Sequence, residues 1–179
     1  TFKPECLEAF RIYGEELIAW NQEFNLTAIT DENGVQIRHF LDSLSCILGM
    51  EEANERLTGK HVIDVGTGAG FPGIPLAILF PEIQFHRVDS ICKKIQVVAA
   101  IAEALGLKNV KAEQARAEQI QGKYDVVTCR AVTQLVDFYA WIAKNLKPDS
   151  EVIALKGGDL VDEIHAFRKQ YPKKKVQVH

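Results

Sequence analysis

Hydrophobic residues recur with two different periods along this chain, and the change between them divides it into two parts. Up to about residue 50 they return every three or four positions, which is typical of one buried helix face. This period predicts helices at 5–20 and at about 34–50, with Ile37, Phe40 and Leu41 on the buried side of the second. From His61 onward, short apolar runs alternate with helical patterns. The predicted strands are 61–66, 83–89, 109–112, 124–129 and 151–155, and the predicted helices are 72–80, 91–105, 132–146 and 158–170.

This alternation indicates an α/β fold, with a largely parallel sheet, helices on both of its faces and a ligand crevice at the carboxyl ends of the strands. We expect residues 1–58 to form N-terminal helices that pack on a catalytic domain at 59–179, with the polar segment 51–60 as a linker. Residues 147–150 are expected to form a turn before the fifth strand. Residues 176–179 resemble a sixth strand with nothing after it, which predicts that the chain is a fragment or that a closing strand is missing.

The composition is that of an ordinary globular protein, since 47% of the 179 residues are apolar and 25% are charged. No apolar run reaches the roughly 18 residues of a membrane span, and no signal-peptide pattern opens the chain. The four cysteines lie far apart and show no metal-binding spacing. We therefore expect free thiols in a cytoplasmic protein, and no metal site.

The charge pattern leaves room for a local nucleic-acid contact. A formal net charge of −3 argues against a protein that coats nucleic acid by its overall charge. Basic residues nevertheless gather locally, with five of them between 168 and 175 and a pair at Lys93–Lys94. They form either a basic face or a solvated helix end.

A glycine-rich turn is the most informative motif. An apolar strand reaches Asp64, and Gly66, Gly68 and Gly70 follow on alternate positions before a helix-like segment. Glycine lets a ligand approach bare backbone, and such turns often need a positive φ. A second strand ends in Asp89, 19 residues after Gly70, where a carboxylate can accept both hydroxyls of a ribose. The two acids could instead be a turn residue and a helix N-cap, but beside the glycines they indicate a cofactor site.

The spacing favours one cofactor over another. Dinucleotide sites carry Gly-x-Gly-x-x-Gly, where a pyrophosphate rests on a helix N-terminus, whereas this turn reads Asp-x-Gly-x-Gly-x-Gly. S-adenosylmethionine has no phosphate, and it offers an ammonium to Asp64, a carboxylate to backbone N–H groups and a ribose to Asp89. Ala117 and Glu118 follow the third strand, where we expect the adenine edge. The predicted cofactor is therefore S-adenosylmethionine.

Further motifs lie between residues 15 and 160. They are Asn25–Ala28, His39–Leu44, Asp64–Leu76, Asp89–Ser90 with Lys93–Lys94, Arg116–Glu118, Tyr124–Val127 with Arg130–Ala131, and Leu155–Gly157. Together they resemble the glucose-inhibited division protein B family. The resemblance implies a class I S-adenosylmethionine-dependent methyltransferase, with a Rossmann-like doubly wound sheet and an N-terminal helical extension. It implies methylation of a guanine N7 in bacterial 16S ribosomal RNA of the small ribosomal subunit, without a membrane partner, and we expect a monomer.

The resemblance also gives roles to single positions. Gly66 and Phe71 would line the methionine end of the cofactor, and Ser90 would accompany Asp89. Arg130 would stand at the mouth where cofactor and base meet, unless it forms a structural salt bridge. His39 would lie near the cleft from the N-terminal helices, unless it only packs between them. Family members usually continue through a closing strand, so the last residues depart from the family pattern.

The residues after the fourth predicted strand narrow the chemistry. Residues 128–132 stand where amino-methylating enzymes place Asn or Asp, two prolines and an aromatic residue, so methylation of an exocyclic amine is disfavoured. Guanine N7 has a lone pair and no proton to remove, so alignment with the sulfonium methyl needs no general base. The predicted catalytic residues are Arg130 and Lys156, which would position the base or its phosphates, and His39. Phe71 would stack on a flipped base.

Other functions remain open at this point. A covalent role for Cys129 in cytosine methylation is the alternative to a buried thiol. The fold would also suit a small-molecule methyltransferase, a non-catalytic adenosyl-binding protein that binds RNA, or a Rossmann dehydrogenase. Transfer of labelled methyl groups to ribosomal RNA, or binding of NAD, would separate them.

Overall fold

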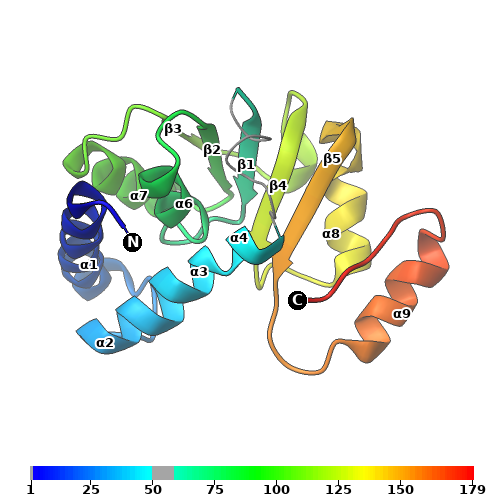
Figure 1. Ribbon diagram of the computed structural model, residues 1–179, viewed down its shortest axis with the longest axis horizontal. Coiled ribbons are helices and arrows are strands. Elements are labelled where there is room, and N and C mark those ends of the chain that lie inside the picture. The colour runs from blue at the N-terminus through cyan, green and yellow to red at the C-terminus, as the bar shows by residue number, and fades with distance from the viewer. Residues whose placement is uncertain (1, 50–58) are drawn as a thin grey trace.

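The computed structural model of the chain describes residues 2–49 and 59–179, and its centre is a parallel sheet of five strands (Figure 1). The strands are β1 (His61–Val65), β2 (Gln84–Asp89), β3 (Val110–Gln114), β4 (Tyr124–Arg130) and β5 (Leu146–Leu155). Their order across the sheet is β3-β2-β1-β4-β5, and each neighbouring pair is parallel. The predicted α/β sheet is confirmed, and the order reverses beside β1, where such folds bind ligands.

Helices connect the strands and precede them. The N-terminal part holds α1 (Pro4–Phe24), α2 (Glu32–Val35), the π-helical turn η1 (Gln36–Leu41), α3 (Asp42–Leu44) and α4 (Cys46–Gly49). The elements between and after the strands are α6 (Gly73–Leu79), α7 (Cys92–Ala104), the 3₁₀ turn η2 (Ala117–Gln119), α8 (Leu135–Ile142), the 3₁₀ turn η3 (Ala143–Asn145) and α9 (Val161–Gln170).

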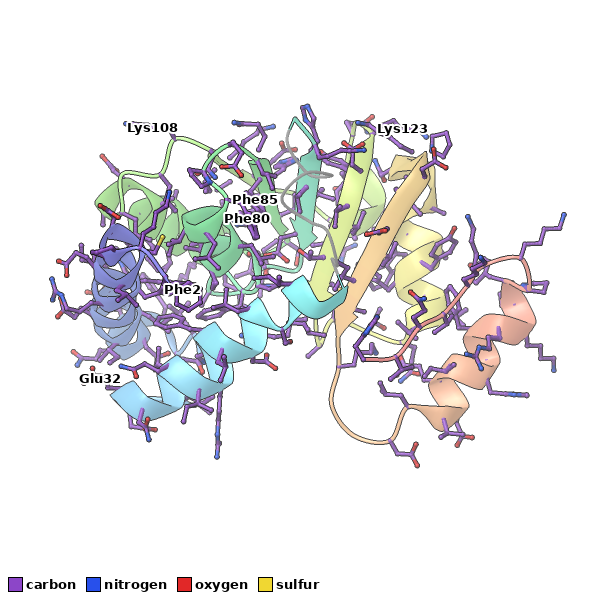
Figure 2. All side chains as sticks on the ribbon, in the orientation of Figure 1. Phe2, Glu32, Phe80, Phe85, Lys108 and Lys123 are labelled. Carbon is purple, nitrogen blue, oxygen red and sulfur yellow. The ribbon has the colours of Figure 1, made fainter. Side chains whose placement is uncertain are left out.

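Two apolar clusters fasten the helices to opposite faces of the sheet. On one face, Leu76 of α6 packs with Phe80 and Phe85, both labelled in Figure 2, and α1 lies outside α6 and α7. On the other face, Phe138 of α8 packs on Val127 of β4, and α9 lies outside α8. Helices on both faces confirm the doubly wound architecture.

The second N-terminal helix differs from its prediction in one respect. Its start is set by Asp31, whose Oδ1 accepts a hydrogen bond from Gly34 N at 2.7 Å. The wider π turn at 36–41 then shifts the helical phase, so Phe40 is buried while Ile37 and Leu41 are 53% and 63% exposed. The expectation that all three are buried was therefore wrong, because a regular helical period cannot show a π turn.

The C-terminal part differs more. Residues 147–150 lie inside β5 as a bulge, because Tyr124 pairs with Leu146 whereas Val126 pairs with Glu151. The expected sixth strand at 176–179 is wrong: these residues have no regular structure and Val178 is exposed. Its first residue is bonded to α9 instead of to a strand, since Arg168 Nη2 donates to the carbonyl oxygen of Val176 at 3.4 Å.

Two further expectations concern the linker after the N-terminal helices and the lack of a membrane span. The expected linker at 51–60, which carries the boundary between residues 58 and 59, lies mostly outside the described residues. Among the helices of residues 2–49 and 59–179, none is both long enough and apolar enough to cross a membrane.

Candidate cofactor site

A hollow of about 320 Å³ opens at the carboxyl ends of β1, β2 and β3. Its wall comes from the ends of these strands, from the segment after β3 and from α8. The lining residues are Val65, Gly66, Val88, Asp89, Ser90, Ala115, Arg116, Ala117, Glu118, Val132 and Trp141. Five of the predicted cofactor residues are thus brought together: Gly66, Asp89, Ser90, Ala117 and Glu118.

The glycine turn (residues 66–70) meets the hollow at its first residue, Gly66. Gly66, Gly68 and Gly70 have φ values of 71°, 59° and 107°, which other residues rarely adopt. A Cβ on Gly66 would come within 2.7 Å of Val132 Cγ2, whereas a Cβ on Gly68 would meet nothing within 4 Å. Gly68 therefore borders open space, and the turn presents bare backbone there.

Asp89 joins the turn to the next strand. Its Oδ2 accepts a hydrogen bond from Gly68 N at 3.0 Å, and its Oδ1 accepts one from Ile91 N at 2.9 Å, just before α7. An ionised carboxylate has about four acceptor positions, so two of them remain free in this hydrogen-bond pattern. Asp89 thus serves as a helix-start residue and still lines the hollow.

Asp64 does not line the hollow. Its carboxylate is fully buried and accepts hydrogen bonds from Thr67 Oγ1 at 2.6 Å, Thr128 Oγ1 at 3.1 Å and Gly73 N at 3.2 Å. Burial raises the pKa of Asp64, and the nearby charge of Arg87 opposes that rise. The expected contact with an ammonium is therefore replaced by a structural role: Asp64 fastens the glycine turn to β4 and α6.

Arg87 completes this buried polar cluster. It pairs with Asp64 across β1 and β2, and its Nη2 donates to the carbonyl oxygen of Gly73. Its guanidinium lies 4.9 Å from the ring centre of Phe85, and burial lowers the pKa of Arg87 to about 10. Gly73 is thus held by the Asp64 carboxylate at its N–H group and by the Arg87 guanidinium at its carbonyl oxygen.

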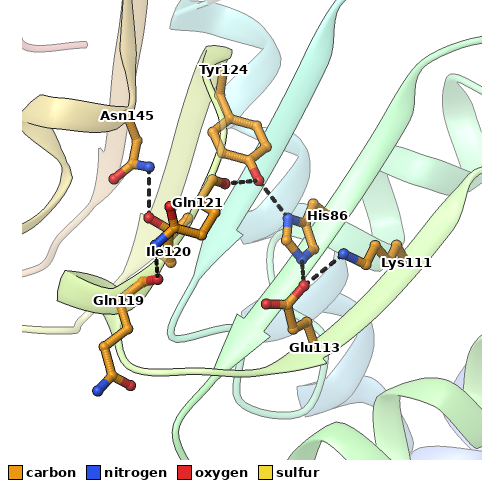
Figure 3. A network of polar contacts seen from close by, with 8 residues as sticks. All are labelled: His86, Lys111, Glu113, Gln119, Ile120, Gln121, Tyr124 and Asn145. Atoms are coloured by element: carbon orange, nitrogen blue, oxygen red, sulfur yellow. Dashed lines mark hydrogen bonds and ion pairs between the residues drawn. The ribbon is translucent and has the colours of Figure 1, made fainter.

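Polar contacts hold the segment that follows residues 115–118, and Figure 3 shows those around Gln119, Ile120 and Gln121. Asn145 Nδ2 donates to the carbonyl oxygens of Ile120 and Gly122 at 3.0 and 2.9 Å. The Tyr124 hydroxyl donates to the Gln121 carbonyl at 3.0 Å and lies 2.7 Å from His86 Nδ1. These bonds fix the loop after β3, and with it Ala117 and Glu118.

Phe71 and Gly70 also lie away from the hollow. The Phe71 ring is 2% exposed, and it stacks with Tyr13 at 5.3 Å and with His39 at 4.6 Å between ring centres. Arg130 Cζ lies 4.6 Å from the centre of the same ring. Since its surface is already covered, Phe71 offers no free face to a flipped base, and the stacking role expected for it was wrong.

Arg130 and His39 both lie against the ring of Phe71. Arg130 Nη1 lies 3.4 Å from both the Arg38 carbonyl oxygen and Asp42 Oδ2, so it reaches the N-terminal helices. His39 Nε2 bonds the Thr27 hydroxyl at 2.8 Å, whereas its Nδ1 is buried without a partner among the described residues. Burial, and then the charge of Arg130, lower the pKa of His39 to about 4, so the ring is neutral near pH 7.

The side chain of Lys156 is bonded to groups outside the hollow. Its ammonium donates to Glu163 Oε1, and to the Thr133 carbonyl oxygen at 2.6 Å, while the same Glu163 oxygen accepts from Leu135 N at 2.7 Å. Lys156 therefore ties α9 to the start of α8. The structure does not bring it to the hollow, so the expected contact with the base or its phosphates has no support here.

The cysteines have the properties expected of unreactive free thiols. All four are free, and burial raises the pKa of Cys129 to about 12, so this thiol is protonated and unsuited to nucleophilic attack. In residues 2–49 and 59–179, no three metal-binding side chains gather.

Sequence reasoning missed several residues of the site. Arg116, Val132 and Trp141 line the hollow, and only the position of helix 132–146 after the fourth strand could have indicated Trp141. Arg87 and Tyr13 support the glycine turn, but both look like ordinary members of a strand and a helix. Their contacts depend on pairing between distant segments, which a single sequence does not display.

Comparison with known proteins agrees with this geometry. A family model described as rRNA small subunit methyltransferase G matches residues 6–179. "Ribosomal RNA small subunit methyltransferase G" from Flavobacterium psychrophilum is 46% identical over 156 residues, which are 84% of this chain and 73% of that protein.

Solved structures support the fold. A ribosomal protein L11 methylase from Lactobacillus delbrueckii subsp. bulgaricus matches with a TM-score of 0.59 at 20% identity, over 73% of this chain and 67% of that one. An S-adenosylmethionine-dependent methyltransferase from Aquifex aeolicus matches with a TM-score of 0.51 at 18% identity, over 67% and 77%. These likenesses show the methyltransferase fold, and the family match confirms the resemblance drawn from the sequence motifs. The chain belongs to the rRNA small subunit methyltransferase G family.

Proposed function

We propose that this protein transfers a methyl group from S-adenosylmethionine to N7 of a guanine in 16S ribosomal RNA. The observation that carries the proposal is Asp89, which lines the hollow beside the bare backbone of Gly68 and keeps free acceptor positions. Membership of the family supports ribosomal RNA of the small subunit as the substrate, and we expect a cytoplasmic monomer.

The residues around the hollow fit this cofactor. Asp89 would accept the two ribose hydroxyls, and the methionine end would lie along Gly66, which lines the hollow, and beside the open space at Gly68. Trp141, Val132 and Ala117 would enclose the flat adenine ring between apolar surfaces. When bound, S-adenosylmethionine supplies a methyl group on a positively charged sulfur.

The protonation states near the site support N7 as the acceptor atom. Guanine N7 has an in-plane lone pair and needs no proton removed, so the protein has only to hold the base in line with the methyl group. His39 is neutral but buried against Phe71, Cys129 is a protonated thiol, and Lys156 is paired with Glu163. These three side chains are thus not placed as exposed general bases or nucleophiles.

Arg130 is the group we assign to the base. It stands at the end of β4 with its side chain partly exposed, between the sheet and the N-terminal helices. Its bonds to Arg38 and Asp42 are long, at 3.4 Å, so exchanging them for guanine O6 or a phosphate costs little. A donor to O6 orients the base and leaves the N7 lone pair free.

The test is methyl transfer in vitro, followed by nucleoside mass spectrometry. Small ribosomal subunits from cells that lack this protein are incubated with the protein and S-adenosylmethionine that carries a labelled methyl group. We expect one labelled 7-methylguanosine per 16S RNA. Label in another nucleoside, or in a small metabolite instead of RNA, would contradict the proposal, and cofactor binding without transfer would favour a non-catalytic RNA-binding protein.

A further inference from the structure

Tyr13 connects the N-terminal helix to the glycine turn. It lies on α1, 56 residues before Ala69, and its side chain is fully buried. Its hydroxyl donates a hydrogen bond of 2.8 Å to the carbonyl oxygen of Ala69, the residue between Gly68 and Gly70. Across the described residues, this hydroxyl is the only donor within reach of that carbonyl.

The phenol ring is held rigidly in place. It stacks between Phe40 of the N-terminal helices and Phe71, which follows the turn, with ring centres 5.0 and 5.3 Å away. A Cβ on Gly70 would come within 2.8 Å of the Tyr13 oxygen, so the hydroxyl also forms a steric wall for the turn. Burial raises the pKa of Tyr13 well above its usual value, which keeps the hydroxyl proton available.

Other bonds hold the N–H groups of the turn, and Tyr13 holds the carbonyl in its middle. The N–H groups of Gly66 and Thr67 donate to the Val88 carbonyl oxygen at 2.8 and 3.1 Å, and Gly70 N donates to the Thr67 carbonyl at 2.8 Å. Gly68 N donates to Asp89. The Ala69 carbonyl shares a planar peptide unit with Gly70 N–H, so the bonds to Thr67 and to Tyr13 hold opposite sides of the same peptide. Gly70, which follows this peptide, resists its rotation very little, so the second bond matters for its orientation.

We propose that Tyr13 is a positioning residue for methyl transfer: through the Ala69 carbonyl, helix α1 sets the conformation of the glycine turn that receives the methionine end of the cofactor. The inference rests on the proposed function and extends it, because it makes the N-terminal helix a working part of the cofactor site. Tyr13 touches neither cofactor nor base. It acts through Ala69 and through the N–H groups of the turn next to it.

The test replaces Tyr13 by phenylalanine, which keeps the ring stack and removes one hydroxyl. The full chain is titrated with S-adenosylhomocysteine by calorimetry, and methyl transfer to small ribosomal subunits is measured. An unsatisfied carbonyl in the turn should weaken binding about 10-fold. The KM for S-adenosylmethionine should rise by a similar factor, whereas kcat at saturating cofactor and the KM for the subunit should change less than about twofold.

Two further variants separate positioning from general stability. Tyr171→Phe removes a hydroxyl from a residue that packs on Tyr139 and Phe167 at α9, and it should leave the affinity unchanged. Phe40→Leu keeps the Tyr13 hydroxyl and loosens its stack, and it should raise the dissociation constant in the same direction as Tyr13→Phe. If Tyr13→Phe is unstable, hydrogen exchange of Gly70 N–H and Phe71 N–H in the folded fraction should still be faster than in the wild type.

The outcomes distinguish the two proposals. Wild-type protein that does not bind S-adenosylhomocysteine at all would refute the proposed function. Wild-type binding with an unchanged dissociation constant in both Tyr13→Phe and Phe40→Leu would overturn the positioning role of Tyr13 alone. A fall in thermal stability without any change of affinity would also overturn it, because that is the signature of a packing residue.

Discussion

Replacing Asp64 by asparagine should destabilise this protein although the change is nearly isosteric. Asp64 is fully buried under α6 and accepts three hydrogen bonds, two from threonine hydroxyls and one from Gly73 N. Asparagine replaces one acceptor oxygen by a donor and removes the negative charge. Hydrogen bonds to a charged group contribute roughly 1.5–3 kcal/mol, against roughly 0.5–1.5 kcal/mol for neutral ones.

Arg87 adds to this loss. Its guanidinium is fully buried, and in the described part of the chain only one of its donors has a partner, the carbonyl oxygen of Gly73. Removing the charge of Asp64 takes away an anion that partly offsets the burial of Arg87. Because the two groups form no direct ion pair among the described residues, the loss should lie no higher than the lower end of the roughly 3–5 kcal/mol that is typical of a broken buried ion pair. The hydrogen bonds that asparagine can still make offset part of this, so we expect a loss of about 3 kcal/mol in the free energy of unfolding.

Urea unfolding followed by tryptophan fluorescence and circular dichroism measures this loss. Glu113→Gln is the control, because it also changes an acid into its amide but Glu113 is 40% exposed and pairs with the exposed Lys111 at 2.6 Å, so its removal should cost about 1 kcal/mol or less. In a double-mutant cycle with Arg87→Met, the two losses should be less than additive by at least about 1 kcal/mol. A loss below about 1 kcal/mol for Asp64→Asn, or strict additivity with Arg87→Met, would refute the reasoning.

Three further predictions concern groups near the site. The folded-state pKa of His39 is lowered from 6.5 to about 4, so the folded protein binds fewer protons than the unfolded chain in this window. Stability should therefore fall by roughly 2 kcal/mol as the pH drops from 7 to 4, and this part of the fall should be missing in His39→Asn, as urea titrations at several pH values would show. Lys156→Met should lower the unfolding free energy by roughly 3 kcal/mol, because Glu163 loses its partner, and Lys156→Met with Glu163→Leu should recover much of it. The cofactor affinity of folded Lys156→Met should stay within about twofold of the wild-type value. A complete loss of cofactor binding would mean that Lys156 belongs to the cofactor site. Cys129 should resist iodoacetamide in the native state, and Cys129→Ser should keep methyl transfer; inactivation by either would restore a covalent role.

The sheet was predictable from sequence because its central strands β1 and β4 are buried along most of their length and read as apolar runs. The helix covering 36–41 was predictable in kind but not in phase, since a π turn leaves no periodic signature. The tail at 176–179 alternates like a strand, but a strand needs a neighbouring strand, and the carbonyl of Val176 is bonded to Arg168 of α9 instead. The type and order of the elements were thus predictable, whereas the phase of a helix with a π turn and the features that depend on a partner segment were not.

The same distinction applies to the site. Asp89 and the glycines could be recognised because their chemistry faces outward from the carboxyl ends of two adjacent strands. The sequence indicated that Asp64 is important. It did not show that helix α6 buries the side chain, so the structural role of Asp64 could not be predicted. Lys156 and Phe71 look like contacts for a base, yet their partners Glu163 and Tyr13 stand 7 residues later and 58 residues earlier in the chain. Only the folded structure shows that Glu163 and Tyr13 already contact these two side chains.

Calorimetric titration with S-adenosylhomocysteine tests most directly whether Asp89 and the glycine turn hold the cofactor. The wild type is compared with Asp89→Asn and with Asp159→Asn, a control in which a similar carboxylate accepts a bond from the residue two positions later, Val161 N, at 3.0 Å. We expect binding by the wild type and the control, and at least about 10-fold weaker binding by Asp89→Asn, because a carboxylate that accepts two hydroxyls loses its charge. Equal affinity of all three proteins, or no binding by the wild type, would contradict the assignment of this hollow to the cofactor.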